Sequence, residues 1–269
     1  LILCVCNLAM KCCKLMKGVH SKKTSSFVKE CLAFCHITIP SISDVYRKVQ
    51  LLLHCAEVAL QNQCLPQTDT CLKSAISLIP DVAPMEEVDG KNIPTEGKLY
   101  TVVKQLLALL VVAPGHPEHG PFYVVKGLFN ALSKFQWQTN STVQMQILID
   151  ILGLLNTYSQ VKFPYHMLHV ESNDELYGLS TGYVSELNDI IGQCVDDIIK
   201  LLTALTAERN DTSTKAIQTK LIIELCTQLI TCMEITEDSC AYIEKLLGLA
   251  LKNKATVVNR QDMGYIKRC

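Results

Sequence analysis

The chain has 269 residues, of which 49% are apolar, so it is long enough to bury a sizeable core. Its 25 basic and 26 acidic residues leave a formal net charge of -1, and no block of like charge occurs along the chain. This balance argues against nucleic acid as a partner, because DNA and RNA binding normally requires a basic face.

The predicted elements are helices from one end of the chain to the other. Apolar residues recur at steps of three and four, which is the period of an amphipathic α-helix. Prolines, turn residues and the predicted N-caps Ser43, Thr139 and Asp211 divide the chain into about ten helices. In chain order they are predicted near residues 1–17, 25–38, 43–62, 67–79, 95–113, 120–136, 140–159, 181–206, 212–233 and 237–252.

Two stretches bear on sheets and membranes. The loop at residues 80–94, like the rest of the chain, contains no alternating β-branched run long enough to predict a sheet. The helix over residues 101–113 is apolar on nearly every side and is expected to lie buried between layers. Its uninterrupted apolar run, residues 106–113, is too short to cross a bilayer, so we expect a soluble chain with no direct membrane insertion.

Antiparallel helices joined by short turns could form a closed bundle or an open stack of helical pairs. About ten helices, each with its own apolar stripe, exceed what one bundle normally holds, whereas stacked pairs bury each stripe against a neighbour. The sequence therefore predicts an all-α, irregular HEAT-like α-solenoid of about ten antiparallel helices, forming a single domain over residues 1–269. The uncapped start at Leu1 suggests the C-terminal part of a longer chain.

Fourteen cysteines could indicate a disulfide framework, but most of them lie at apolar positions of predicted helices. We interpret them as small buried hydrophobes in a reducing cytosol. Neighbours such as Cys35 and His36 point in different directions on a helix, so they do not form a nucleophile and base. The pair Cys31 and Cys35 lacks the second ligand pair that zinc spacing requires.

The stretch VVAPGHPEHGPFYVV, residues 111–125, contains two histidines three positions apart. A metal-dependent hydrolase would combine them with a second His-x-x-His pair, so that His116, His119, His166 and His169 surround zinc. The alternative is a corner, in which prolines and glycines end one helix and start the next. We favour the corner and predict no catalytic, cofactor-binding or metal-ligating residue.

Five segments carry a resemblance to a known family. They are FCHITIPSI (34–42), AEVALQNQCLPQTDTCLKSAISLIPDV (56–82), DGKNIPTEG (89–97), PGHPEHGPF (114–122) and YHMLHVESNDELYG (165–178). In this order they resemble the C-terminal half of the retriever large-subunit family, the retromer-large-subunit-like component of the Commander endosomal recycling assembly.

The resemblance implies a non-catalytic scaffold that is cytoplasmic and peripheral on endosomes and needs no cofactor. Its C-terminal solenoid would wrap around a small phosphoesterase-fold subunit, while an arrestin-like subunit would bind a preceding N-terminal part. COMMD and coiled-coil proteins and a sorting-nexin cargo adaptor would join the assembly. Its cargo would be membrane proteins returned from endosomes to the plasma membrane.

The resemblance and the residue pattern meet at the predicted corner. His116, Glu118 and His119 are expected to brace the corner or to contact a partner. Ser172 to Asp174 can start a short helix, and its exposed Tyr177 is a further candidate contact. Two alternatives stay open, an unrelated HEAT or armadillo-type adaptor and the metal-dependent hydrolase.

Overall fold

The computed structural model describes residues 1–115, 119–139, 141–160, 162–165, 167, 170–177, 180–208, 212–232, 240, 243–244, 246–248 and 250, with 206–208, 212–214 and 232 described by their backbone alone. The chain divides into two compact units. Unit 1 comprises Leu1–Gln138 and Pro164–Tyr177, and unit 2 comprises Thr139–Phe163 and Gly178–Cys269. The prediction that residues 1–269 form one domain stays a prediction.

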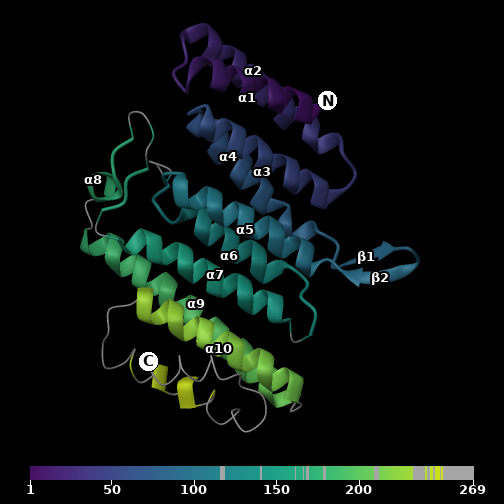
Figure 1. Cartoon of the computed structure of the whole chain (residues 1–269), viewed down its shortest axis with the longest axis vertical. Coiled ribbons are helices and arrows are strands. Elements are labelled where there is room, and N and C mark those ends of the chain that lie inside the picture. Colours follow the sequence, from purple (N-terminus) through teal and green to yellow (C-terminus); the bar gives the residue numbers. More distant parts are fainter. Residues whose placement is uncertain are drawn as a thin grey trace. The chain divides into compact units, whose positions relative to one another are not determined.

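Unit 1 is a two-layered stack of helices. Its elements are α1 (Ile2–Met16), α2 (Lys22–Thr38), η1 (Ile39–Ser41), α3 (Val45–Gln61), α4 (Leu65–Ser77), η2 (Ile79–Asp81), β1 (Met85–Val88), β2 (Lys91–Pro94), α5 (Glu96–Val112), α6 (Tyr123–Lys134) and α8 (Asn173–Tyr177). Helices α1, α3 and α5 pack in succession, as do α2, α4 and α6. Pairs α1–α2 and α3–α4 lie side by side (Figure 1). This stacking of pairs confirms the all-α, HEAT-like fold class.

Helix α3 lies at the centre of this stack. It contacts α1, α2, α4 and α5. Because it has neighbours on several sides, it buries residues around most of its circumference: Val49, Leu51, Leu52, Leu53, Cys55, Ala56, Val58 and Ala59. Burying one Leu or Val side chain stabilises the fold by about 1.5–3 kcal/mol, so α3 contributes much of the core of unit 1.

The helix starts follow capping side chains that differ slightly from those predicted. Ser21 accepts the N–H of Thr24, so α2 begins at Lys22 rather than near residue 25. Asp44, rather than Ser43, caps α3. Ser141, rather than Thr139, caps α7 by accepting the N–H of Gln144. Asp211 lies outside the described residues.

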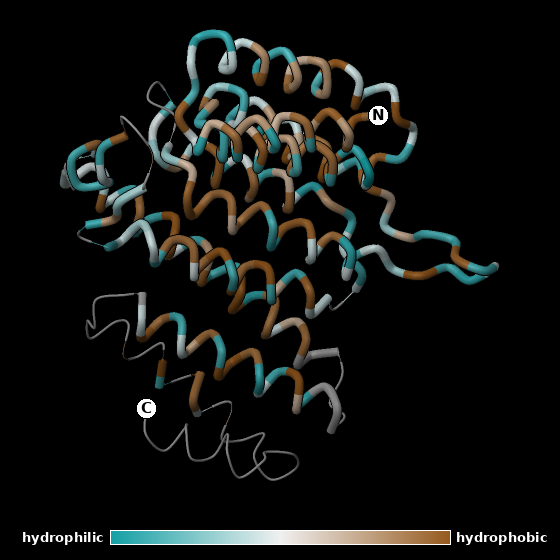
Figure 2. Tube along the Cα trace, turned by 45° about the horizontal axis from the view of Figure 1, so that its top comes forward, coloured by the Kyte–Doolittle hydropathy of each residue, from teal (hydrophilic) through white to brown (hydrophobic). Residues whose placement is uncertain are grey.

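The segment predicted as a plain loop at residues 80–94 contains an antiparallel hairpin. Strands β1 and β2 pair from Met85 with Pro94 to Val88 with Lys91, and all eight residues are exposed. Asp89 and Gly90 have φ values of 51° and 72°, which suit a tight hairpin turn. The hairpin projects from the helices, and its turn is hydrophilic (Figures 1 and 2).

The expectation that the helix over 101–113 lies buried between layers holds for one of its faces only. That face is buried, but Ala108 is exposed and Val112 is 43% exposed. The reason is that α5 packs on α3 with one face, while Gln105, Ala108 and Leu109 line a groove described below. None of the helices that the structure describes combines the length and apolarity needed to span a bilayer.

Unit 2 contains α7 (Thr142–Ser159), α9 (Thr181–Glu208) and α10 (Thr212–Cys232), which pack on one another. Helix α7 contacts both of the others and buries nine residues, from Met145 to Tyr158. The amide of Gln146 donates to the carboxylate of Glu224 at 2.7 Å, joining α7 to α10. The predicted helix over 237–252 falls largely outside the described residues.

Candidate protein-interaction site

The corner between α5 and α6 requires glycine at position 115. A Cβ atom there would lie 2.7 Å from the Cα of Pro121 and would collide with the hydroxyl of Tyr177. Only a residue without a side chain therefore allows the chain to turn back toward α6 at this point. His116 and Glu118 lie outside the described residues.

The described histidine of the corner, His119, lies on the surface beside α6. Its ring stacks on that of Tyr123, with centroids 4.7 Å apart and planes inclined by 29°. The ammonium of Lys73, from α4, lies 4.8 Å from the centroid of the Tyr123 ring and forms an ion pair with Asp69 at 2.8 Å. We call Asp69, Lys73, Tyr123 and His119 the aromatic row.

The aromatic row combines features that suit protein recognition. Tyr123 is 45% exposed, and it is held by contacts on two sides, so little rotamer freedom remains to be lost on binding. Tyrosines are enriched at interfaces, where a large ring supplies contact area. The sequence indicated His119, but not Tyr123 or Lys73, because the lysine comes from a helix about 50 residues earlier in the chain.

Tyr177 lies at the end of the short helix α8, which the sequence predicted to begin near Ser172. The carbonyl of Ser172 accepts the N–H groups of Glu175 and Leu176, as expected for a helix start. The buried Asn173 accepts a hydrogen bond from the Tyr165 hydroxyl at 3.2 Å. Tyr177 is half-buried rather than exposed, because its hydroxyl packs against Gly115. It supports the corner and offers only part of its ring to a partner.

The four-histidine metal site cannot be assembled from the described residues, since His116, His166 and His169 lie outside them. His119 is the member of that set whose position is known, and its ring is stacked on Tyr123. The described residues therefore do not test the alternative of a metal-dependent hydrolase.

A groove of about 530 Å³ opens on the other helical layer of unit 1. It is lined by Leu3 of α1, by Gln50, His54 and Glu57 of α3, and by Ala108 and Leu109 of α5, among others. Its lining mixes aliphatic and polar side chains. Among them, Nδ1 of His54 lies 3.5 Å from a carboxylate oxygen of Glu57. No local pattern in the sequence predicts the groove, because its walls come from three separate helices.

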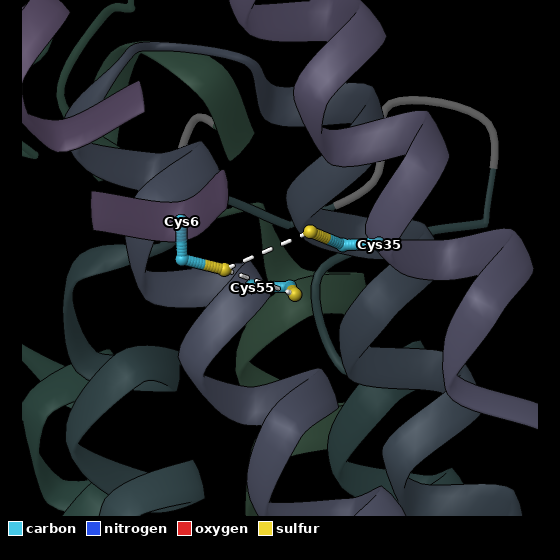
Figure 3. Close-up of side chains that lie close together, drawn as sticks. All are labelled: Cys6, Cys35 and Cys55. Carbon is cyan, nitrogen blue, oxygen red and sulfur yellow. Dashed lines mark hydrogen bonds between the residues drawn. The ribbon is translucent and has the colours of Figure 1, made fainter. Parts of the chain in front are cut away.

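Three cysteines meet inside unit 1 (Figure 3). The sulfur of Cys6, on α1, lies 3.8 Å from that of Cys35, on α2, and 3.7 Å from that of Cys55, on α3. The prediction of buried thiols is confirmed, since these side chains are at most 1% exposed. Hydrogen bonds from Cys55 and Cys6 lower the pKa of Cys35 to about 4, whereas the bond to Cys35 raises the pKa of Cys6 to about 12.

Comparison with known proteins identifies the family of this chain. Residues 1–268 match the family described as the VPS35L C-terminal domain. A human protein named VPS35 endosomal protein-sorting factor-like is 40% identical over 208 residues, 77% of this chain and 22% of its own length. Relatives of corresponding name from Dictyostelium discoideum and Drosophila melanogaster are 37% and 34% identical, covering 92% and 90% of this chain.

The match runs through nearly the whole chain. It therefore excludes the alternative that the chain is an unrelated helical-repeat adaptor. The chain spans about a quarter of the length of these relatives, which are named as endosomal sorting factors. The chain belongs to the VPS35L C-terminal domain family.

Proposed function

We propose that this chain is a non-catalytic scaffold segment of an endosomal cargo-recycling complex of the retriever type. Its role is to bind a small phosphoesterase-fold subunit and so to support the return of membrane proteins from endosomes to the plasma membrane. Membership of a sorting-factor family supports the endosomal role. The open stack of helical pairs supports the scaffold role, because such stacks present long surfaces to partners.

The observation that carries the proposal is the aromatic row. A ring that is nearly half exposed, yet braced by His119 and Lys73, is typical of the few anchors that supply most of the affinity of an interface. The flanking Asp69 and Lys73 give the row a polar rim. We therefore place the contact with the small subunit at the aromatic row and the adjoining corner.

The remaining parts of the assembly follow from the same proposal. An arrestin-like subunit would bind outside this chain, in a preceding N-terminal part. COMMD proteins, coiled-coil proteins and a sorting-nexin cargo adaptor would join the complex on the cytoplasmic face of endosomes. The chain would act there by holding partners together, without catalysing a reaction.

Co-expression tests the proposal. The chain and the small phosphoesterase-fold subunit should co-purify as a stoichiometric complex on size-exclusion chromatography. Tyr123→Ala should weaken that complex, whereas Tyr100→Ala should not, although Tyr100 forms the same kind of pair with Lys104, at 5.2 Å. Failure of the unmodified chain to bind, under conditions where the full-length protein does bind, would refute the proposed contact.

A further inference from the structure

The three cysteines in the core of unit 1 form a cluster that the proposed function does not use. Cys6, Cys35 and Cys55 come from three consecutive helices, and their sulfur atoms all lie within 4.8 Å of one another (Figure 3). Packing of the core does not by itself require cysteine at these three positions, because an aliphatic side chain could be buried there instead. Three sulfurs meeting at one point is the arrangement that thiolate ligands of a metal adopt.

The sulfur separations fit a shared metal ion better than a disulfide. Zinc–thiolate bonds of about 2.3 Å place two sulfurs about 3.8 Å apart in a tetrahedral site and about 4.0 Å apart in a trigonal one. The pairs Cys6–Cys35 and Cys6–Cys55 are 3.8 and 3.7 Å apart. A disulfide would require one pair to close to about 2.05 Å, with movement of its helices.

The surroundings of the cluster also fit a metal. Its all-sulfur ligand set selects soft ions, of which Zn²⁺ and Cu⁺ are the common biological examples. The thiol of Cys71, on α4, is also buried in unit 1. It lies outside the group of three, so it could serve as a fourth ligand only if α4 moved toward the cluster.

We infer that Cys6, Cys35 and Cys55 bind one thiophilic metal ion, Zn²⁺ or Cu⁺, which crosslinks α1, α2 and α3. Binding forms metal–sulfur bonds and releases the thiol protons to solvent, without any change of oxidation state. Zinc would complete four-coordination with Cys71, whereas Cu⁺ would be satisfied by the three thiolates. In either case the ion would fix the first helical pair onto α3.

Metal analysis of the whole chain tests the inference. The chain should be expressed with added zinc or copper, purified without chelators under reducing conditions, and analysed by mass spectrometry for both metals. We expect about one ion per chain, and at least a tenfold lower ratio in each of Cys6→Ala, Cys35→Ala and Cys55→Ala. Cys31→Ala is the matched control, because Cys31 is also buried on α2 but lies outside the cluster.

Two further variants distinguish Zn²⁺ from Cu⁺ and test whether a histidine ligates the metal. Cys71→Ala should release Zn²⁺ but retain Cu⁺. The His119→Ala variant should retain either metal. Loss of the metal from this variant would overturn the assignment of the ligands to the cysteines. Because a cysteine variant could lose metal by misfolding, the unmodified chain is also loaded with Co²⁺, whose thiolate charge-transfer absorption reports sulfur ligation directly.

Three results would overturn the inference. The first is a reduced, folded chain that holds only trace metal and gives no Co²⁺–thiolate absorption. The second is a disulfide between Cys6 and either partner in protein alkylated at the moment of cell lysis. The third is full metal content in all three cysteine variants. None of these results bears on co-purification with the small subunit, so the two proposals fail separately.

Discussion

The ammonium of Lys73 lies over the ring of Tyr123, 4.8 Å from its centroid, and so joins α4 to α6 at the surface. The Tyr123 ring also stacks on the ring of His119, with the ring centroids 4.7 Å apart. A surface cation–π pair contributes about 0.5–1 kcal/mol, which holds the ring in place but adds little to the fold. Its main effect is to restrict the orientation of an exposed aromatic side chain.

Tyr123→Ala should therefore affect binding more than stability. We expect a loss of about 2 kcal/mol in binding free energy, or roughly a thirtyfold rise in Kd, for the small phosphoesterase-fold subunit. Isothermal titration calorimetry measures the change, and thermal unfolding should shift little. An unchanged Kd would show that the aromatic row is not the contact surface.

Gly115→Ala should destabilise unit 1. The new methyl group would lie 2.7 Å from the Cα of Pro121, a backbone atom that cannot rotate away, and would press on the Tyr177 hydroxyl. Overpacking of this kind costs about 1–3 kcal/mol, measurable by urea unfolding.

Gly127→Ala is the control for that substitution. Gly127 lies within α6, and a Cβ there would meet no atom within 4 Å. Alanine should stabilise the helix by about 0.5–1 kcal/mol. Equal effects of the two substitutions would contradict the described packing of the corner.

Glu96→Ala should also lower the free energy of unfolding. The Glu96 carboxylate is buried, with the residue 6% exposed, and accepts the backbone N–H of Gln138 at 2.6 Å. A hydrogen bond to a charged group contributes about 1.5–3 kcal/mol, and its loss leaves the Gln138 N–H without that acceptor. Glu57→Ala, at an exposed position of α3, should change stability by less than about 0.5 kcal/mol.

Gly90→Ala should loosen the hairpin without unfolding either unit. Gly90 has a φ of 72°, where an L-residue with a side chain costs about 1–2 kcal/mol. Since every residue of both strands is exposed, the effect should stay local. Limited trypsin digestion should cut after Lys91 faster than in the unmodified chain, with the melting temperature unchanged. Gly97→Ala, at the start of α5, should leave the cleavage rate as it is.

Helices were the most predictable part of the fold, because an apolar stripe repeats over many residues. In α9, for example, Leu187, Ile191, Cys194 and Ile198 are all buried as their spacing indicates. Helix starts were less predictable. Ser43 and Asp44 are both capping types, and only the direction of the incoming chain decides which side chain reaches the free N–H groups.

The features that sequence reasoning missed are either very short elements or contacts between residues far apart in the chain. Two strands of four exposed residues show no alternation of burial, and the Asp89–Gly90 turn was the remaining signal. The cluster of Cys6, Cys35 and Cys55 joins positions 29 and 49 residues apart, so no local spacing pattern could reveal it. Surface sites built across helices require the packing to be known first.

The central position of α3 makes the unfolding of unit 1 cooperative. Loss of α1 would uncover the Cys55 side of α3, and loss of α4 would uncover another side of the same helix. A weakness in the first helical pair would therefore spread to the second pair through α3. An ion held by Cys6, Cys35 and Cys55 would join α1 and α2 to α3. It would therefore determine whether local unfolding of the first helical pair extends to the rest of unit 1.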